Sequence, residues 1–110
     1  MPEKDLISSE ELKEKLDRGD DFKLVMSLGE WEYKAKHLPG SLRVSTVEEA
    51  LETLHPQDEI VLYDSGPPCI ASRMACRMLK ERGYERVRRY AGGLQEWDSV
   101  GYALEGEPLA

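Results

Sequence analysis

The stretch "IVLYDSGPPCIASRMACRMLKERGY", residues 60–84, carries the pattern that decides the fold. An apolar run at 60–63 is interrupted by a loop rich in glycine and proline, and apolar residues with helical spacing follow. A strand without polar alternation is typical of a parallel sheet buried on both faces. The stretch therefore predicts a strand–loop–helix unit, with a central buried strand at 59–63 and a helix at 71–82.

Strand-like and helix-like segments alternate on both sides of this unit. Further strands are expected at 22–27, 41–44 and 86–90, and further helices from the capping box of 8–11 to Gly19, at 29–36, from Thr46 to before Pro56, and at 94–99. Met74, Ala75, Met78 and Leu79 form the expected apolar stripe of the central helix. The pattern predicts an α/β domain with about five strands in a mostly parallel sheet.

Composition limits the class of protein. The 110 residues are 40% hydrophobic and 34% charged, which fits a single compact domain over residues 1–110. Apolar runs are only a few residues long and the N-terminus is charged, so we expect a cytoplasmic protein without a membrane span. The net charge of −7 argues against nucleic acid as a partner. Basic residues gather at 73–89, where they could steer a small anion or form a solvated face.

The two cysteines, Cys69 and Cys76, do not indicate a disulfide framework. On one helix their Cα atoms would lie roughly 10 Å apart, beyond the roughly 7 Å limit for a disulfide. Cys76 reads as a packing residue. His, Cys and acidic residues show no metal-ligand spacing, so we expect neither a metal nor a cofactor.

Three segments, in this order, resemble the rhodanese-like (sulfurtransferase) family. They are "EWEYKAKHLPGSLRV" at 30–44, the 60–84 stretch, and "YAGGLQEWDSVGY" at 90–102. The resemblance implies a three-layer fold with helices on both faces of the sheet. It also implies sulfur transfer, in which a cysteine at the start of the loop takes sulfur from a donor such as thiosulfate as a persulfide. A thiol or cyanide then accepts that sulfur.

The chain departs from the family pattern at this site. Asp64 stands where the resemblance implies the nucleophilic cysteine, and the loop is about two residues longer than the common form, similar to a subgroup with a second cysteine at the position of Cys69. Upstream, the usual Asp-Val-Arg is replaced by "MSL" at 26–28. Both departures concern the chemistry of the site, and neither disturbs the fold.

The resemblance places an anion-binding loop after the central strand, built by backbone N–H groups and a helix N-terminus. Its residues are Ser65, Gly66, Pro67, Pro68, Ile70, Ala71, Ser72 and Arg73. Asp64 cannot form a persulfide, but its carboxylate could fill the loop and repel thiosulfate. Cys69, just before the helix, is the alternative nucleophile, because the helix dipole and Arg73 would favour a thiolate.

Two functions are therefore open. The first is a rhodanese-like domain with a degenerate or inactive site, serving as an anion-binding, protein-binding or regulatory module. The alternative is an active sulfurtransferase that carries a persulfide on Cys69. The expected partners are a small sulfur-containing anion such as thiosulfate or a protein thiol, and neither nucleic acid nor a membrane.

Overall fold

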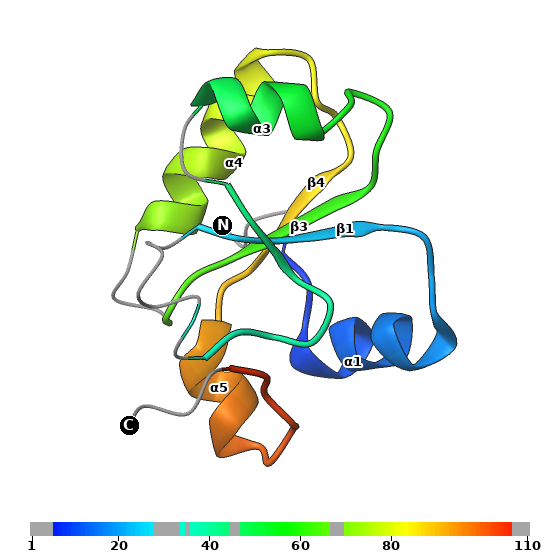
Figure 1. The fold of residues 1–110 in the computed structure, drawn as a ribbon, viewed down its shortest axis with the longest axis vertical. Coiled ribbons are helices and arrows are strands. Elements are labelled where there is room, and N and C mark those ends of the chain that lie inside the picture. The colour runs from blue at the N-terminus through cyan, green and yellow to red at the C-terminus, as the bar shows by residue number, and fades with distance from the viewer. Residues whose placement is uncertain (1–5, 28–33, 35, 45–46, 67–69, 107–110) are drawn as a thin grey trace.

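The structure, a computed structural model, describes residues 6–27, 34, 36–44, 47–66 and 70–106. In chain order its elements are α1 (Ser9–Arg18), β1 (Lys23–Met26), β2 (Leu42–Arg43), α3 (Val47–Thr53), β3 (Ile60–Tyr63), α4 (Ala71–Glu81), β4 (Val87–Tyr90) and α5 (Gly93–Ser99). Figure 1 shows the strands in the middle of the molecule, with α3 and α4 on one side and α1 and α5 on the other. The predicted α/β class is confirmed.

The described sheet has four strands in the order β2-β1-β3-β4, and every pairing is parallel. About five strands were expected, and an isolated parallel bridge between Leu6 and Arg89 extends the sheet beyond β4. Met26, Tyr63 and Tyr90 pair across the three longer strands. The carboxyl ends of these strands therefore meet at one edge, where parallel α/β sheets bind ligands.

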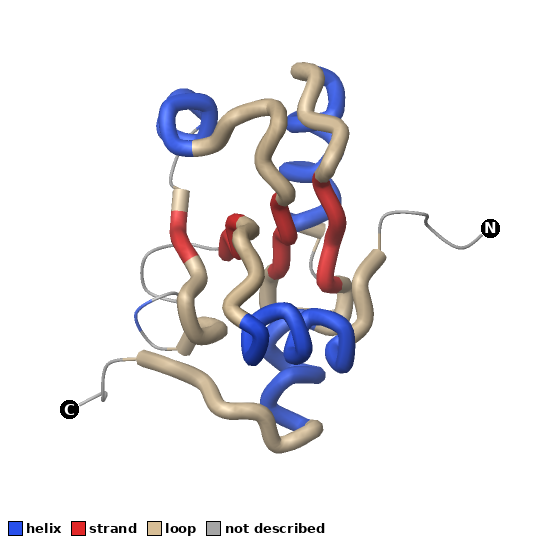
Figure 2. Tube along the Cα trace, turned by 90° about the vertical axis from the view of Figure 1, so that its right-hand side faces the viewer, coloured by secondary structure: helices blue, strands red, loops and turns tan. Residues whose placement is uncertain are grey.

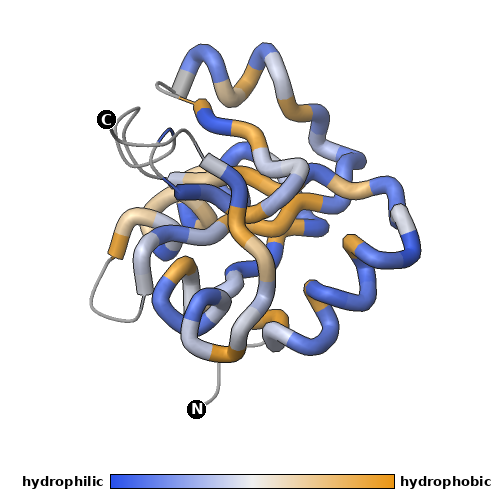
Figure 3. The backbone as a smooth tube through the Cα atoms, turned by 60° about the horizontal axis from the view of Figure 1, so that its bottom comes forward, coloured by the Kyte–Doolittle hydropathy of each residue, from blue (hydrophilic) through white to orange (hydrophobic). Residues whose placement is uncertain are grey.

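The two faces of the sheet carry separate hydrophobic clusters. One joins Val61 and Tyr63 of β3 to α1 and α5, and the other joins Ile60 and Leu62 to α3 and α4. This explains why β3 shows no polar alternation, since side chains on both of its faces are buried. Figure 2 shows the helices at opposite ends of the view with the strands between them, and Figure 3 shows hydrophobic segments in the middle of the molecule with mostly hydrophilic segments around them.

Local signals at the ends of α1 behave as the sequence predicted. The Oγ of Ser8 accepts a hydrogen bond from the N–H of Glu11 at 3.1 Å, as in a capping box. Gly19 ends the helix with a φ of 71°, a conformation that favours glycine. None of the helices in the described ranges is long and apolar enough to cross a membrane.

The expected apolar stripe of α4 is wrong at Met74, whose residue surface is 62% exposed. The buried residues of this helix are Ser72, Cys76 and Leu79, spaced four and three apart. The error arises because a polar residue, Ser72, faces the interior in place of a hydrophobic one. Cys76 packs in the core as predicted. The expected helix at 29–36 lies mostly outside the described residues.

Candidate functional site

The segment 64–72 joins β3 to α4 at the carboxyl edge of the sheet, and we refer to it as the Asp64 loop. The edge position is the one that the strand–loop–helix pattern predicted. Pro67, Pro68 and Cys69 lie outside the described residues, so the role of Cys69 stays a prediction. The described parts are 64–66 and 70–72, the two ends of the loop.

The Asp64 side chain lies inside the loop and is only 1% exposed. Its Oδ1 accepts a hydrogen bond from the N–H of Gly66 at 3.2 Å, and its Oδ2 accepts one from the N–H of Ser72 at 2.9 Å. Each carboxylate oxygen is thus bonded to one end of the loop. The Asp64 carboxylate therefore occupies one backbone donor at each end of the loop.

Asp64 also completes the N-terminus of α4. The first N–H groups of a helix have no acceptor within the helix, and Ile70, the residue at the cap position, makes no side-chain cap hydrogen bond. The first turn of α4 contains no acidic residue. The carboxylate of Asp64 accepts the N–H of Ser72 instead, at the end of the helix where a negative charge is stabilised.

Helix α5 fixes the orientation of the loop backbone. The N–H groups of Leu94 and Gln95 donate to the carbonyl oxygens of Asp64 and Ser65, at 3.0 and 2.9 Å. In a trans peptide the N–H points away from the carbonyl. Carbonyls turned toward α5 therefore turn the next N–H groups inward, which is the direction in which Gly66 donates to the Asp64 carboxylate.

Gly93 allows this close approach of α5 to the loop. A Cβ at this position would lie 2.3 Å from the carbonyl oxygen of Asp64 and 2.7 Å from the nitrogen of Gly66. The φ of 61° is also one that L side chains rarely adopt. Glycine is needed here for both reasons, which gives the "GG" at 92–93 a structural role at the site.

Arg89 belongs to the site although sequence reasoning did not single it out. It is 5% exposed, and its Nε donates to the Oγ of Ser72, itself 0% exposed, at 3.3 Å. The available signal was strand alternation: Val87 and Arg89 share one face of β4, and Val87 packs in the cluster that contains α4. A charged residue on the same strand face as a buried valine predicts a polar contact in the interior.

The other described residues of the predicted loop differ in exposure. Ser65, Ile70 and Arg73 are exposed, Ala71 is half-buried as the first residue of α4, and Gly66 is buried. Arg73 was expected to add positive charge near Cys69, and its side chain lies at the surface. The buried cation on this side of the sheet is Arg89.

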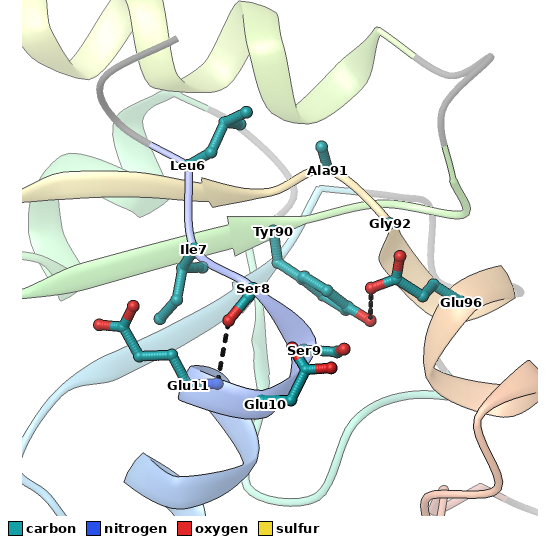
Figure 4. A pocket seen from close by; sticks show the side chains of 10 residues that line it. All are labelled: Leu6, Ile7, Ser8, Ser9, Glu10, Glu11, Tyr90, Ala91, Gly92 and Glu96. Atoms are coloured by element: carbon teal, nitrogen blue, oxygen red, sulfur yellow. Dashed lines mark hydrogen bonds between the residues drawn. The ribbon is translucent and has the colours of Figure 1, made fainter. Parts of the chain in front are cut away.

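A separate cleft of about 570 Å³ opens between the start of α1, the end of β4 and α5 (Figure 4). Its lining is Leu6, Ile7, Ser8, Ser9, Glu10, Glu11, Tyr90, Ala91, Gly92 and Glu96. The Tyr90 hydroxyl donates to Oε1 of Glu96 at 3.0 Å, and burial followed by this hydrogen bond raises the pKa of Tyr90 well above its usual range. Three glutamates line the cleft, so it is a poor place for an anion.

The described residues contain no group of three or more His, Cys, Asp or Glu side chains placed to hold a metal ion. All buried side-chain nitrogen and oxygen atoms in the same ranges have hydrogen-bond partners. The buried polar side-chain atoms at the two described ends of the Asp64 loop are therefore hydrogen-bonded within the protein.

Comparison with known proteins supplies the family. The model of the rhodanese-like domain matches residues 8–99. The chain is 35% identical over 81 residues to the HTH-type transcriptional regulator Rv0324 of Mycobacterium tuberculosis, covering 71% of this chain and 35% of that protein. It is 30% identical over 94 residues to YrkF of Bacillus subtilis, whose name proposes a sulfur carrier, covering 83% and 49%. The chain thus spans about a third and about half of these two relatives.

Solved structures match the fold at lower identity. The crystal structure of the Alr3790 protein from Anabaena sp. has a TM-score of 0.83 at 24% identity and covers 94% of both chains. The solution structure of its rhodanese-like domain has a TM-score of 0.84 at 24% identity, covering 96% of this chain and 81% of that one. The BH2092 protein from Bacillus halodurans has a TM-score of 0.84 at 22% identity, covering 92% and 76%. These matches confirm the predicted three-layer fold.

Proposed function

The chain belongs to the rhodanese-like domain family, and from that premise we propose that its Asp64 loop is a degenerate sulfurtransferase site. Asp64 takes the position of the nucleophilic cysteine, and its carboxylate fills the loop in place of a substrate anion. The domain works as a binding or regulatory module. Its partner is a small sulfur-containing anion or a protein thiol that approaches the rim of the loop.

One observation carries this proposal: both oxygens of the buried Asp64 carboxylate accept backbone N–H groups, one from each end of the loop. A carboxylate is a weak nucleophile toward sulfur and cannot hold a persulfide. Its charge also opposes the entry of a second anion at contact distance, because electrostatic interactions are strong in a buried site. Asp64 therefore removes the nucleophile that would attack thiosulfate and occupies the backbone donors that would bind it inside the loop, which leaves an anion only the rim.

The relatives are compatible with such a module. Rv0324 is named as a transcriptional regulator, and this chain matches 35% of its length. This supports the regulatory form of the proposal.

The test is a thiosulfate:cyanide sulfur-transfer assay. We expect no turnover above buffer for the wild-type chain and measurable thiocyanate from Asp64→Cys, because the loop donors that hold Asp64 would then surround a thiol. Asp64→Ser is the matched control, since it has a similar small side chain and no thiol. A folded Asp64→Cys variant that stays inert would show that loop length or the "MSL" segment at 26–28 limits activity.

The name of YrkF favours a second candidate, sulfur transfer on Cys69. In that reaction the Cys69 thiolate attacks the outer sulfur of thiosulfate, the sulfur–sulfur bond breaks, and sulfite leaves with the bonding electrons. Cyanide then removes the outer sulfur as thiocyanate and regenerates the thiolate. Wild-type turnover that Cys69→Ser abolishes, with a persulfide on Cys69 by mass spectrometry, would establish this candidate and refute the degenerate site.

A further inference from the structure

The outer side of α4 carries the two most exposed large hydrophobic side chains of the described residues. Ile70 is 58% exposed and Met74 is 62% exposed. The N–H of Met74 donates to the carbonyl oxygen of Ile70 at 3.0 Å, so the two residues lie one helical turn apart on the same side of the helix. Single exposed hydrophobic residues are common at protein surfaces, whereas adjoining ones form a patch that points to a contact surface.

Two arginines border this apolar pair. Arg73 and Arg77 are exposed and lie four residues apart, and Nε of Arg77 is also 3.4 Å from Oε1 of Glu81 at the end of the helix. Together with the apolar pair they occupy positions i, i+3, i+4 and i+7, which fall on one side of a helix. We call the set Ile70, Arg73, Met74 and Arg77 the α4 face. It is apolar in the middle and basic along one edge.

Helix α3 exposes a set of residues with the opposite charge. Glu48 and Glu52 are exposed and lie four residues apart, and Leu51, which is 39% exposed, lies beside them. We call these three residues the α3 face. The last turn of α3 contains no basic residue, and the first turn of α4 contains no acidic one. Like charges four residues apart on a helix repel each other, so contact between the two faces would relieve repulsion on both helices.

Both faces lie on the same side of the molecule. Ala50 and Leu54 of α3 pack in one cluster with Cys76 and Leu79 of α4, and Figure 1 shows the two helices on one side of the strands. The exposed residues of each helix therefore turn away from the sheet on that side. A twofold axis there brings α4 of each copy to α3 of the other, so every contact is made twice.

We propose that the α4 face binds the α3 face of a second copy of this chain in a twofold-symmetric dimer. Ile70 and Met74 bury apolar area against Leu51, and the arginines pair with the glutamates at the edge of the contact, where opposite charges fix the orientation. A second copy is the occupant because the chain itself displays the complementary charges. The inference goes beyond the proposed function and does not depend on it, although Ile70 also belongs to the Asp64 loop.

Sedimentation velocity over a range of concentrations tests the dimer. The wild-type chain should show a reversible, concentration-dependent dimer below about 1 mM, a range that includes weak interactions. Met74→Ser should raise the dimer Kd at least about tenfold, because it removes the most exposed apolar side chain of the contact. Met74 lies at the surface, so this variant should keep the far-UV circular dichroism of the wild-type chain.

Charge reversal tests the choice of α3 as the occupant. Two double variants are compared: Arg73→Glu/Arg77→Glu and Glu48→Lys/Glu52→Lys. Each protein alone places like charges across both contacts and should dimerise at least about tenfold more weakly than the wild-type chain. A mixture of the two should form heterodimers, because an acidic α4 face meets a basic α3 face at one contact and the wild-type pairing holds at the other. Added salt should weaken the wild-type dimer.

Lys13→Glu/Arg18→Glu is the matched control, since it changes the net charge equally on α1, which packs on the other face of the sheet. It should leave dimerisation nearly unchanged. A wild-type chain that is monomeric at about 1 mM would overturn the inference. So would a dimer that is insensitive to both charge reversals, a mixture that forms no heterodimer, or a control that weakens dimerisation as much as Arg73→Glu/Arg77→Glu. Thiosulfate turnover, which tests the proposed function, is a separate measurement.

Discussion

Charged side chains occupy both ends of β3, and the two ends hold them differently. At the amino end, Glu59 forms ion pairs with Lys15 and with Arg86, and Arg86 is largely exposed. At the carboxyl end, Asp64 is buried and its oxygens accept backbone N–H groups. The amino end uses side-chain donors, from the buried Lys15 and the largely exposed Arg86, whereas the carboxyl end uses backbone donors.

The difference lies in the origin of the hydrogen-bond donors. A loop and a helix N-terminus converge at the carboxyl edge, where the N–H groups of Gly66 and Ser72 both donate to the Asp64 carboxylate. At the amino edge, Glu59 depends on lysine and arginine side chains for its partners. Charge alone therefore does not identify the site, and the origin of the hydrogen-bond donors does.

The largest expected effect comes from Gly93→Ala, which disturbs only the carboxyl end. The new Cβ would collide with loop backbone and require an unfavourable φ, so we expect a loss of about 4 kcal/mol of unfolding free energy. Urea unfolding measures it. Gly19→Ala, at a φ of 71° with nothing within 4 Å of a Cβ, is the control and should cost about 1 kcal/mol. Equal losses of unfolding free energy for the two variants would contradict a close approach of α5 to the loop at Gly93.

A direct comparison of the two ends gives the intermediate effect. Asp64→Ala should cost about 3 kcal/mol, because two buried N–H groups lose their acceptor. Glu59→Ala should cost about 1 kcal/mol, because Arg86 lies at the surface and the buried Lys15 keeps Asp20 as a second partner. Added salt should reduce the Glu59 effect and leave the Asp64 effect nearly unchanged. Similar losses and similar salt dependence would contradict the distinction between the ends.

The smallest effect concerns the ion pair of Glu11 with Arg88, on the opposite face of β4 from Arg89. The hydrogen bond from Arg88 lowers the pKa of Glu11 below its usual value of 4.5. The pair therefore stabilises the fold above about pH 4.5 and loses that contribution as the pH falls through the lowered pKa. Glu11→Gln should cost about 0.5 kcal/mol near pH 6, a difference that disappears near pH 3. A difference that persists in acid would mean that Glu11 acts through packing.

Much of the fold follows from local patterns in the chain. The apolar run at 60–63 predicted a central buried strand, and Ser8 and Gly19 predicted the ends of α1. These signals are local because capping and strand burial involve residues that are near in sequence. The position of Asp64 at the start of the loop was likewise readable, since a strand followed by glycine and proline must turn there.

The sequence by itself thus determined the α/β class, the order of the elements and the residue at the head of the loop. Only the tertiary structure decided what surrounds that residue. Ser72 and Arg89 are 17 positions apart and meet because β4 packs beside β3 in one register. The same packing places Ser72 in the interior, where its Oγ accepts a hydrogen bond from the Arg89 guanidinium, while Met74 lies at the surface. Helical periodicity describes a single element, and a contact between two elements depends on the sheet that joins them.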